Sequence, residues 1–476
     1  MAQSSGFYID GQWVPPSRRQ PAAVINPATE EAIDTIDLGS EADVDRAVAA
    51  AKHAFTSFSN TSREQRIALF DRIIDGYQAR FDDLADTITR EIGAPTWFSR
   101  EVQTGMALRH FIHTRDVLKD YSFEYMMGTS LVRREAFGVC GLITAWNWPL
   151  LLIASKLAPA LAAGCTVILK PSELSPLSAI VLAEVLHDAG VPPGVFNMVM
   201  GDGPTVGDAI SCHPDIDLIS FTGSTRAGIQ IAKAAADTVK RVHQELGGKS
   251  ANIILPDADL SVAVPDGVRR AFINSGQSCI APTRMLIQRD QMDAALRIAK
   301  ETAEAMTVGE PTAATTRLGP LANAAQYGRV QDMIGLGIAE EATLLCGGLG
   351  RPEGLQGGYY ARPTIFSGVT RDMRIAKEEI FGPVLSIMAY EDEEDAIELA
   401  NATVYGLAAY VFSSDRVRAH EVAKRLRAGR VFVNGAPTDV IAPFGGYKQS
   451  GNGRESGVFG LEEFLEVKAV LGYESQ

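Results

Sequence analysis

The sequence predicts an α/β protein with two parallel sheets, and three observations lead to this prediction. Between residues 137 and 256, short apolar runs alternate with longer ones, which is typical of repeated β-α-β units. A second stretch of the same character follows Lys249. Residues 40–125 differ from both, because their apolar side chains recur at helical spacing and predict packing helices.

The predicted elements can be placed in order along the chain. The helical stretch begins after Ser40, where an acid three residues later, Asp43, is a weak helix-start signal. The first α/β unit alternates strands and helices over the runs 138–145, 150–163, 166–169, 177–189, 196–200, 217–221 and 229–238. The second unit has predicted strands at 251–255, 285–288, 384–390 and 408–412, and predicted helices around 290–306, 323–340 and 394–402. We expect residues 130–135 and 459–470 to add strands that leave the main body and pair with another subunit.

Length and composition exclude several classes of protein. The chain has 476 residues, of which 46% are apolar and 21% charged, so it is neither a small disulfide-stapled module nor a disordered chain. Its formal charge of −14 opposes phosphate backbones and anionic lipid surfaces, so we expect no nucleic-acid or membrane partner. Neither a targeting segment nor an uninterrupted membrane-spanning segment is visible.

The cysteines indicate neither a disulfide framework nor a structural metal. They are odd in number and form no CxxC or zinc-spaced group with histidine. The five are Cys140, Cys165, Cys212, Cys279 and Cys346. We therefore expect a reducing, cytoplasmic location and no bound metal.

Polar and small residues follow the predicted strands of the first unit. Ligands of parallel sheets bind beyond the carboxyl ends of the strands, where this chain has Asn147, 170–173, 201–203 and 223–224. In Thr222-Gly223-Ser224 a strand ends where a helix begins, and the free amides of that helix start can hold a phosphate, with the Ser224 hydroxyl as a further donor. The alternative is an ordinary serine N-cap.

Two neighbouring segments also suggest a nucleotide. In Lys170-Pro171-Ser172-Glu173, the lysine can donate to ribose hydroxyls, and the carboxylate can accept from a 2′-OH and repel a 2′-phosphate, which favours NAD over NADP. A surface Lys/Glu pair is the alternative. The glycines at 201, 203 and 207 are weak evidence, because their spacing is one residue too long for GxGxxG.

Three further residues have the chemistry of a catalytic site. Cys279 lies in a small, polar segment, which suits a reactive thiol better than an apolar neighbourhood does. Glu245 stands just after a short strand and before two glycines that let the backbone pass close to a ligand, so its carboxylate can serve as a general base. The Asn147 amide can donate to a developing oxyanion, although a turn asparagine is the alternative. Taken singly, Cys279 and Glu245 also fit purely structural roles.

Together and in this order, these segments resemble the NAD(P)-dependent aldehyde dehydrogenase superfamily over essentially the whole chain. The matching segments are Asn26-Pro27-Ala28-Thr29, Trp146-Asn147-Trp148-Pro149, Lys170-Pro171-Ser172-Glu173, Phe221-Thr222-Gly223-Ser224, Glu245-Leu246-Gly247-Gly248-Lys249, Gly276-Gln277-Ser278-Cys279, Glu378-Glu379-Ile380-Phe381-Gly382-Pro383-Val384 and Pro443-Phe444-Gly445-Gly446-Tyr447-Lys448-Gln449-Ser450-Gly451. The joint pattern is far more specific than any one of its members.

The resemblance implies a role for each catalytic candidate. Cys279 would be the nucleophile, Glu245 the general base, and Asn147 the oxyanion donor together with the Cys279 backbone N–H. Lys156 would relay or position a proton. The implied reaction is attack of Cys279 on the aldehyde, hydride transfer to NAD, and hydrolysis of the resulting thioester with Glu245 as base.

The resemblance also implies the cofactor contacts. Lys170 and Glu173 would hold the adenine ribose and Ser224 the pyrophosphate, while Glu379 and Phe381 would contact the nicotinamide ribose and ring. The full set of expected cofactor residues is Trp146, Lys170, Ser172, Glu173, Gly203, Gly223, Ser224, Leu246, Glu379 and Phe381.

The expected substrate pocket combines a bulky and a small residue beside the oxyanion donor with two isoleucines and a serine next to the nucleophile. Its members are Trp148, Ser155, Ile273, Ser278 and Ile280. Such a pocket should suit an apolar, aromatic or medium-chain aldehyde. The loop 435–442 contains no Arg or Lys that could hold a semialdehyde carboxylate.

The resemblance further implies a Rossmann-like NAD-binding domain over 1–118 and 137–247, an α/β catalytic domain over 248–445, and a small β oligomerisation flap from 119–136 and 455–476. We expect a homodimer or homotetramer. Two other functions stay open: a CoA-acylating enzyme, against which the presence of Glu245 argues, and a non-catalytic NAD-binding protein, against which Cys279, Glu245 and Asn147 argue together.

Overall fold

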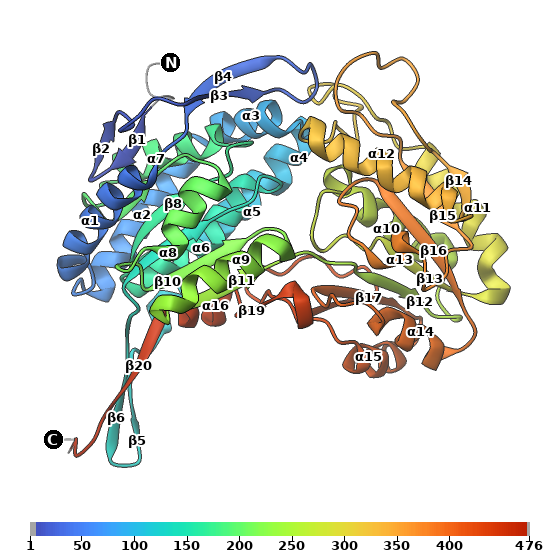
Figure 1. The fold of residues 1–476 in the computed structure, drawn as a ribbon. Coiled ribbons are helices and arrows are strands. Elements are labelled where there is room, and N and C mark those ends of the chain that lie inside the picture. Colours follow the sequence, from blue (N-terminus) through green and yellow to red (C-terminus); the bar gives the residue numbers. More distant parts are fainter. Residues whose placement is uncertain (1–5, 474–476) are drawn as a thin grey trace.

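The computed structural model describes residues 6–473, which form two α/β bodies side by side with a narrow extension of strands projecting from one of them (Figure 1). Each body is built around one largely parallel sheet, so the predicted α/β class is confirmed. No helix within the described range is both long and apolar enough to cross a membrane.

The first sheet contains the β-α-β unit predicted for residues 137–256. Its strand order, within residues 6–473, is β19 (Gly451–Asn452), β11 (Arg241–Glu245), β10 (Leu218–Thr222), β7 (Val139–Ile143), β8 (Thr166–Lys170), β9 (Phe196–Met198), β1 (Phe7–Ile9) and β2 (Gln12–Val14). The strands β7 to β11 are parallel, and β1, β2 and β19 pair antiparallel at the edges.

The order of these strands reverses beside β7. The chain runs outward from β7 through β8 to β9 and then returns to place β10 on the other side of β7. At such a reversal the connections leave in opposite directions and a crevice opens beyond the carboxyl ends of the strands. The segments that follow β7 and β10 therefore lie at a ligand site.

Two groups of helices cover this sheet. In the first group, α1 packs on β7, β8 and β9 and contacts α8, and α8 in turn contacts α9. In the second group, α6 and α7 pack together, and α2, α3 and α5 pack against them. Their bounds are α1 (Glu41–Phe58), α2 (Arg63–Ala79), α3 (Phe81–Ile92), α4 (Thr96–Phe98), α5 (Gly105–Asp120), α6 (Pro149–Ala163), α7 (Leu177–Asp188), α8 (Asp208–Cys212) and α9 (Thr225–Ala235). The predicted helix start is confirmed, because the Ser40 backbone N–H donates to Asp43 Oδ2 at 3.0 Å in a capping box.

The second sheet contains all four strands predicted after Lys249. Among the described residues its order is β14 (Thr343–Cys346), β15 (Thr364–Ser367), β16 (Val384–Tyr390), β13 (Arg284–Gln288), β12 (Ala251–Ile254), β17 (Ala408–Phe412) and β18 (Arg430–Val433). Its helices are α10 (Leu260–Phe272), α11 (Met292–Glu304), α12 (Ala324–Ala339), α13 (Arg374–Lys377), α14 (Glu393–Asn401) and α15 (Arg416–Arg425). The central strands are buried on both faces, which is why they read as continuous apolar runs.

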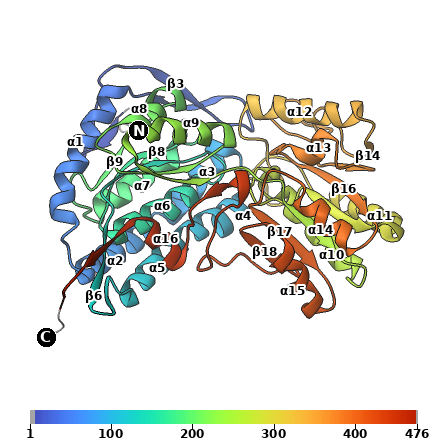
Figure 2. The same cartoon turned by 60° about the horizontal axis from the view of Figure 1, so that its bottom comes forward.

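A three-stranded sheet forms the projecting extension in Figures 1 and 2. It consists of β20 (Leu465–Val470), β6 (Ser130–Ala136) and β5 (Glu124–Met127), and a separate pair joins β3 (Pro21–Ile25) to β4 (Ala32–Asp37). The predicted strand over 459–470 is wrong in its first part, where the chain forms α16 (Gly457–Glu463). Leu461 is fully buried where α16 packs on α5 and α6, and this packing stabilises a helical turn there instead of a strand.

Candidate active site

A cavity of about 480 Å³ opens at the crevice predicted by the strand order. It is lined by the ends of β7 and β10, by the segment after β11, and by residues of the second body. Six of the expected cofactor residues line it, namely Trp146, Gly223, Ser224, Leu246, Glu379 and Phe381. Thr222, Arg226, Gln326, Arg329 and Tyr405 also line it, although they were not among the expected cofactor residues.

Ser224 caps α9 and borders this cavity as well. Its Oγ accepts a hydrogen bond from the Ala227 backbone N–H at 3.2 Å, so the N-cap alternative is confirmed. A serine hydroxyl that accepts one bond can still donate its own proton. The first turn of α9 therefore offers a hydroxyl donor and the positive end of a helix dipole to the cavity.

Glu379 and Phe381 enter the cavity from the second body. The Gly248 backbone N–H donates to Glu379 Oε1 at 2.9 Å, and burial raises the pKa of Glu379 to about 7. Phe381 packs edge-on against Trp146, with ring centroids 5.5 Å apart. An acceptor and an aromatic face thus stand opposite the start of α9.

Four of the expected cofactor residues lie one strand further along. Lys170 ends β8, and its Nζ donates to Gly201 O at 2.5 Å, Pro171 O at 3.0 Å and Glu173 Oε2 at 3.3 Å. Ser172 and Glu173 follow Lys170 in the segment after β8, and Gly203 lies in the segment after β9. None of these four residues lines the 480 Å³ cavity. The group occupies the next strand ends at the same edge of the sheet, within reach of a ligand that extends from the crevice.

Cys279 lies where this cavity meets a second one of about 170 Å³. The thiol and Leu152 border both spaces. Burial, followed by the negative charges of Glu245, Glu379 and Glu455, raises the pKa of Cys279. The thiol is therefore protonated at neutral pH until a positive charge or a proton acceptor comes close.

The loop that carries Cys279 is clamped to Asn147. The Asn147 Nδ2 donates to Gln277 O at 3.0 Å, and the Asn274 Nδ2 donates to Asn147 O at 2.8 Å. Asn274 and Ser275 both adopt positive φ, near 53° and 55°, so the chain reverses sharply before the cysteine. This clamp joins Asn147 to the loop that carries Cys279, and both residues line the 480 Å³ cavity.

Glu245 is the last residue of β11, and its side chain is 3% exposed. Within residues 6–473, neither of its carboxylate oxygens has a hydrogen-bond partner. Burial and the neighbouring Glu455 raise the pKa of Glu245 well above its ordinary value, against the opposing charges of Lys156, Arg454 and Arg430. A buried carboxylate with a raised pKa binds a proton more strongly once it is ionised, which suits a general base for water.

Lys156 forms a buried ion pair that sequence reasoning did not foresee. Its Nζ lies 2.5 Å from Glu455 Oε1, and both side chains are almost completely buried. Burial acts to raise the pKa of Glu455, but the charge and hydrogen bond of Lys156, together with His243 and His110, lower it. Glu455 stands four residues after the last matching motif, but no pattern within the sequence links it to residue 156.

The glycine pair after Glu245 approaches protein groups more closely than the sequence suggests. A Cβ on Gly247 would lie 2.3 Å from Glu379 Oε2, and one on Gly248 would lie 2.3 Å from Cys279 O. We expected these glycines to let the backbone pass close to a ligand. In the structure, the groups that approach the glycine backbone are Glu379 and the loop that carries Cys279.

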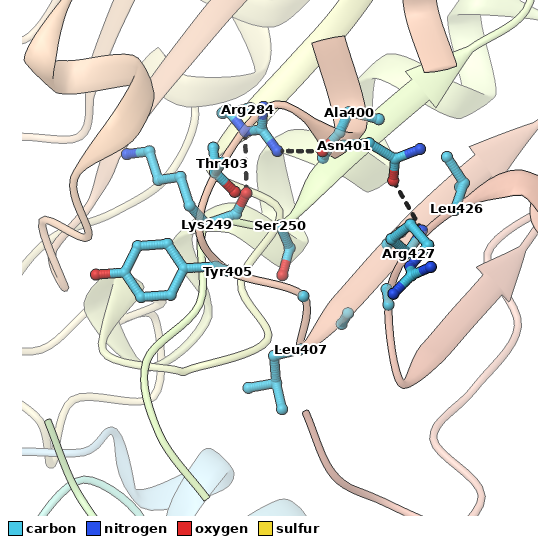
Figure 3. Close-up of a pocket in the computed structure, with 15 residues that line it drawn as sticks. Lys249, Ser250, Arg284, Ala400, Asn401, Thr403, Tyr405, Leu407, Leu426 and Arg427 are labelled. Atoms are coloured by element: carbon cyan, nitrogen blue, oxygen red, sulfur yellow. Dashed lines mark hydrogen bonds between the residues drawn. The ribbon is translucent and has the colours of Figure 1, made fainter. Parts of the chain in front are cut away.

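The end of this glycine segment is fixed where it enters the second sheet (Figure 3). The Arg284 guanidinium donates to Lys249 O at 2.9 Å, Leu399 O at 2.7 Å and Ala400 O at 2.8 Å. Arg284 thereby joins the segment after Glu245 to the end of α14. Its side chain is buried, so these backbone hydrogen bonds stabilise the charge.

The 170 Å³ cavity contains all five residues expected around the substrate: Trp148, Ser155, Ile273, Ser278 and Ile280. It is also lined by side chains that sequence reasoning missed, namely Val102, Met106, His110, Leu151, Leu152, Arg270, Tyr410, Arg430, Thr438, Val440, Phe444 and Glu455. Met106 and His110 are one helical turn apart on α5, and Trp148, Leu151, Leu152 and Ser155 follow helical spacing along α6 and its start. That spacing was the available signal, but it is shared with ordinary packing faces.

Two arginines reach this second cavity from outside the 435–442 loop. Arg270 donates to Asp266 Oδ2 at 2.7 Å and to Gly435 O at 2.6 Å. Arg430 donates to Ala442 O at 2.6 Å and to Pro443 O at 3.1 Å. Arg270 is thus paired with a carboxylate, whereas Arg430 has only backbone carbonyls as partners, and its buried Nε has none among the described residues.

Comparisons with known proteins agree with this architecture. A model of the aldehyde dehydrogenase family matches residues 13–470. A 3-succinoylsemialdehyde-pyridine dehydrogenase of a Pseudomonas species is 56% identical over 469 residues, covering 98% of both chains.

Solved structures show the same likeness. Aldehyde dehydrogenase C of Pseudomonas syringae, a cysteine-to-alanine variant in complex with NAD+ and octanal, is 54% identical with a TM-score of 0.99, over 100% of this chain and 98% of that one. A betaine aldehyde dehydrogenase of Staphylococcus aureus in complex with NAD+ is 36% identical with a TM-score of 0.96, over 100% of this chain and 96% of that one. The chain therefore belongs to the aldehyde dehydrogenase family.

Proposed function

We propose that this chain oxidises an apolar aldehyde to its carboxylic acid with NAD as hydride acceptor. The observation that carries the proposal is the position of Cys279, whose thiol borders both the 480 Å³ and the 170 Å³ cavities. A nucleophile at such a junction can hold the substrate carbon on one side and face a hydride acceptor on the other.

In the first half of the proposed reaction, the Cys279 thiol gives its proton to water and its sulfur bonds to the aldehyde carbon, whose carbonyl oxygen becomes the oxyanion of a thiohemiacetal. The Asn147 amide and the Cys279 backbone N–H stabilise the oxyanion, since Asn147 Nδ2 has a second N–H besides the one that donates to Gln277 O. Bound NAD supplies a hydride acceptor and a positive charge. Loss of hydride from the substrate carbon leaves a thioester on Cys279.

In the second half, Glu245 takes a proton from water while the water oxygen bonds to the thioester carbon. The carbon–sulfur bond then breaks, which releases the carboxylic acid and returns the Cys279 sulfur. Lys156 acts through Glu455, to which it is paired, and so sets the charge beside Glu245.

The larger cavity fits a dinucleotide by the nature of its groups. The start of α9 with Ser224 suits a pyrophosphate, while Glu379 offers an acceptor for ribose hydroxyls and Phe381 an aromatic surface. Glu173 at the neighbouring strand end supports a preference for NAD, because its carboxylate would repel a 2′-phosphate.

The smaller cavity favours a neutral substrate. Most of its wall is apolar, and the charge of Arg270 is paired with Asp266. The names of two relatives include octanal and a pyridine-bearing semialdehyde, which are compatible with an apolar or aromatic substrate.

The decisive experiment measures NADH formation by the wild type and by Cys279→Ala with acetaldehyde, hexanal, octanal, benzaldehyde and succinic semialdehyde. We expect activity that falls at least about a thousandfold in the variant. Cys212→Ala, which removes an exposed thiol far from both cavities, is the matched control. An inert wild type that still binds NAD would favour a non-catalytic role.

The product and the substrate ranking test the finer parts of the proposal. Free acid is expected as product, and an acyl-CoA formed only with added CoA would favour the acylating alternative. Comparable kcat/KM values for succinic semialdehyde and benzaldehyde would contradict the neutral, apolar pocket.

The expectations about assembly and domains remain part of the proposal. The chain passes from the first sheet to the second near residue 248. This supports a cofactor domain over 1–118 and 137–247 and a catalytic domain over 248–445, although β19 at 451–452 joins the first sheet.

Exposed Tyr125, Met126 and Met127 on β5 support a homodimer or homotetramer through the flap. Light scattering that gives a monomer would contradict this. The five free cysteines fit the proposed reducing cytosol.

A further inference from the structure

His243 is a buried titratable residue beside the proposed general base, and no step above uses it. It lies two residues before Glu245 on β11, so both side chains project from the same face of the strand. Its Nε2 is 3.7 Å from Glu245 Oε1, and both side chains are at most 3% exposed. In the part of the chain that is described, Nε2 and both Glu245 oxygens lack hydrogen-bond partners.

The other ring nitrogen of His243 is already held. Nδ1 lies 3.0 Å from the Oγ of Ser220, its register partner on β10, and Ser220 is fully buried. The ring fits because residue 453 is glycine with φ near 76°, where a Cβ would lie 2.3 Å from His243 Cδ2. The imidazole is therefore fixed in place with one free nitrogen facing the carboxylate.

We propose that His243 is a positioning residue for Glu245, which holds the carboxylate through Nε2 in both of its protonation states during hydrolysis of the thioester. This inference rests on the proposed function. The present 3.7 Å exceeds a hydrogen-bond distance, and contacts of this kind tighten when the reacting groups are in place.

A neutral imidazole held by a hydroxyl can serve both states of the base. When Glu245 is ionised, Nε2–H donates to the carboxylate and the Ser220 hydroxyl donates to Nδ1. When Glu245 has taken the proton of water on Oε2, Nε2–H still donates to Oε1, which is then the carbonyl oxygen of the acid. The ring keeps the same tautomer throughout, and the Ser220 hydroxyl keeps its bond to Nδ1.

The surrounding charges keep the imidazole neutral in this scheme. Burial and the positive charge of Lys156 on α6 lower the pKa of His243 to about 3, against the charge of Glu455. The charged groups facing Glu245 are Glu455 and Arg454 after β19, Lys156 on α6 and Arg430 on β18, and the Cys279 thiol also lies near it. His243 is the neutral donor in this set.

Loss of the Nε2–H donor should raise the pKa of Glu245. A hydrogen bond to a charged carboxylate is stronger than one between neutral groups, so His243 stabilises the ionised form more than the protonated one. In His243→Leu we expect kcat near neutral pH to fall about tenfold to a hundredfold, and the rise of kcat with pH to shift to higher pH. In His243→Gln the amide can donate or accept after a flip, so kcat should stay within a few-fold of wild type.

The test combines the pH profile of kcat with rapid measurement of the first NADH turnover. The proposal expects His243→Leu to keep the rate of the first turnover and to lose only later turnovers, and Ser220→Ala to show a smaller shift in the same direction. If His243→Leu does not fold, Ser220→Ala and His243→Gln decide by the same profile.

Three outcomes would overturn the role of His243. They are an unshifted pH profile in both His243→Leu and Ser220→Ala, an equal loss in His243→Leu and His243→Gln, or a first turnover slowed as much as the later ones. A wild type without NADH formation would instead overturn the proposed function itself.

Discussion

The two cavities that meet at Cys279 are built from different parts of the fold. The larger one is formed mainly by segments that directly follow strands, at the reversal of strand order beside β7. The smaller one is formed by faces of α5 and α6 and by loops far apart in the sequence. The strand-end cavity uses backbone geometry that the fold imposes, whereas the helix-face cavity uses side chains that can change without disturbing the sheet.

This difference predicts separable effects of substitution. Changes in the larger cavity should alter the use of NAD with every aldehyde, and changes in the smaller one should alter the choice of aldehyde. Residues at the junction should affect the chemistry itself.

The largest effect after loss of Cys279 is expected for Glu245→Gln, a residue that lines neither cavity but whose charge acts on the Cys279 thiol. Without a base for water the thioester should accumulate, so steady-state kcat should fall about a hundredfold to ten-thousandfold while the first NADH turnover persists. Stopped-flow absorbance separates the two phases. Glu91→Gln, which changes a buried glutamate outside both cavities, is the matched control. A first turnover lost together with kcat would place Glu245 before the thioester and contradict the assignment.

Ser155→Trp should change the smaller cavity alone. Ser155 is 4% exposed in a space of about 170 Å³, and an indole there would occupy the room for a long chain. We expect kcat/KM for octanal to fall by roughly tenfold or more, with acetaldehyde much less affected and the KM for NAD unchanged. Ser155→Ala keeps the space and serves as control. Equal losses for both aldehydes would show that the residue does not select by length.

Ser224→Ala should change the larger cavity alone. The variant loses the hydroxyl at the start of α9, and we expect the KM for NAD to rise roughly threefold to tenfold with every aldehyde. It also loses a helix cap, so Ser62→Ala, which removes the equivalent cap of α2, controls for stability. A similar KM in both variants would remove Ser224 from cofactor binding.

The smallest effect concerns stability, at a buried carboxylate outside both cavities. Glu91 accepts from the Leu177 backbone N–H at 2.7 Å, and burial raises its pKa to about 7 from 4.5. Between these values the folded chain keeps a proton that the unfolded chain releases, so this group makes stability fall as pH rises toward 7. The Tm of Glu91→Gln relative to wild type should therefore be higher at pH 8 than at pH 5. A constant difference between the two pH values would contradict the raised pKa.

Local patterns in the sequence explain how much of the molecule could be predicted. The alternation of apolar runs correctly placed the parallel strands, because strands buried on both faces must be apolar throughout. The strand over 459–463 was predicted wrongly, because the packing of Leu461 against α5 and α6 decides that turn and no local pattern reports it.

The sequence by itself determined the two-sheet α/β class and the candidate residues at strand ends, since strand length, helix length and turn residues are local properties. The tertiary structure alone decided that Lys156 pairs with Glu455, that His243 faces Glu245, and that α5 supplies a wall of the smaller cavity. These contacts join residues that lie far apart in the chain or depend on what is buried nearby. Burial and charge then shift the pKa values of Cys279, Glu245 and Glu379, and such shifts exist only in the folded environment.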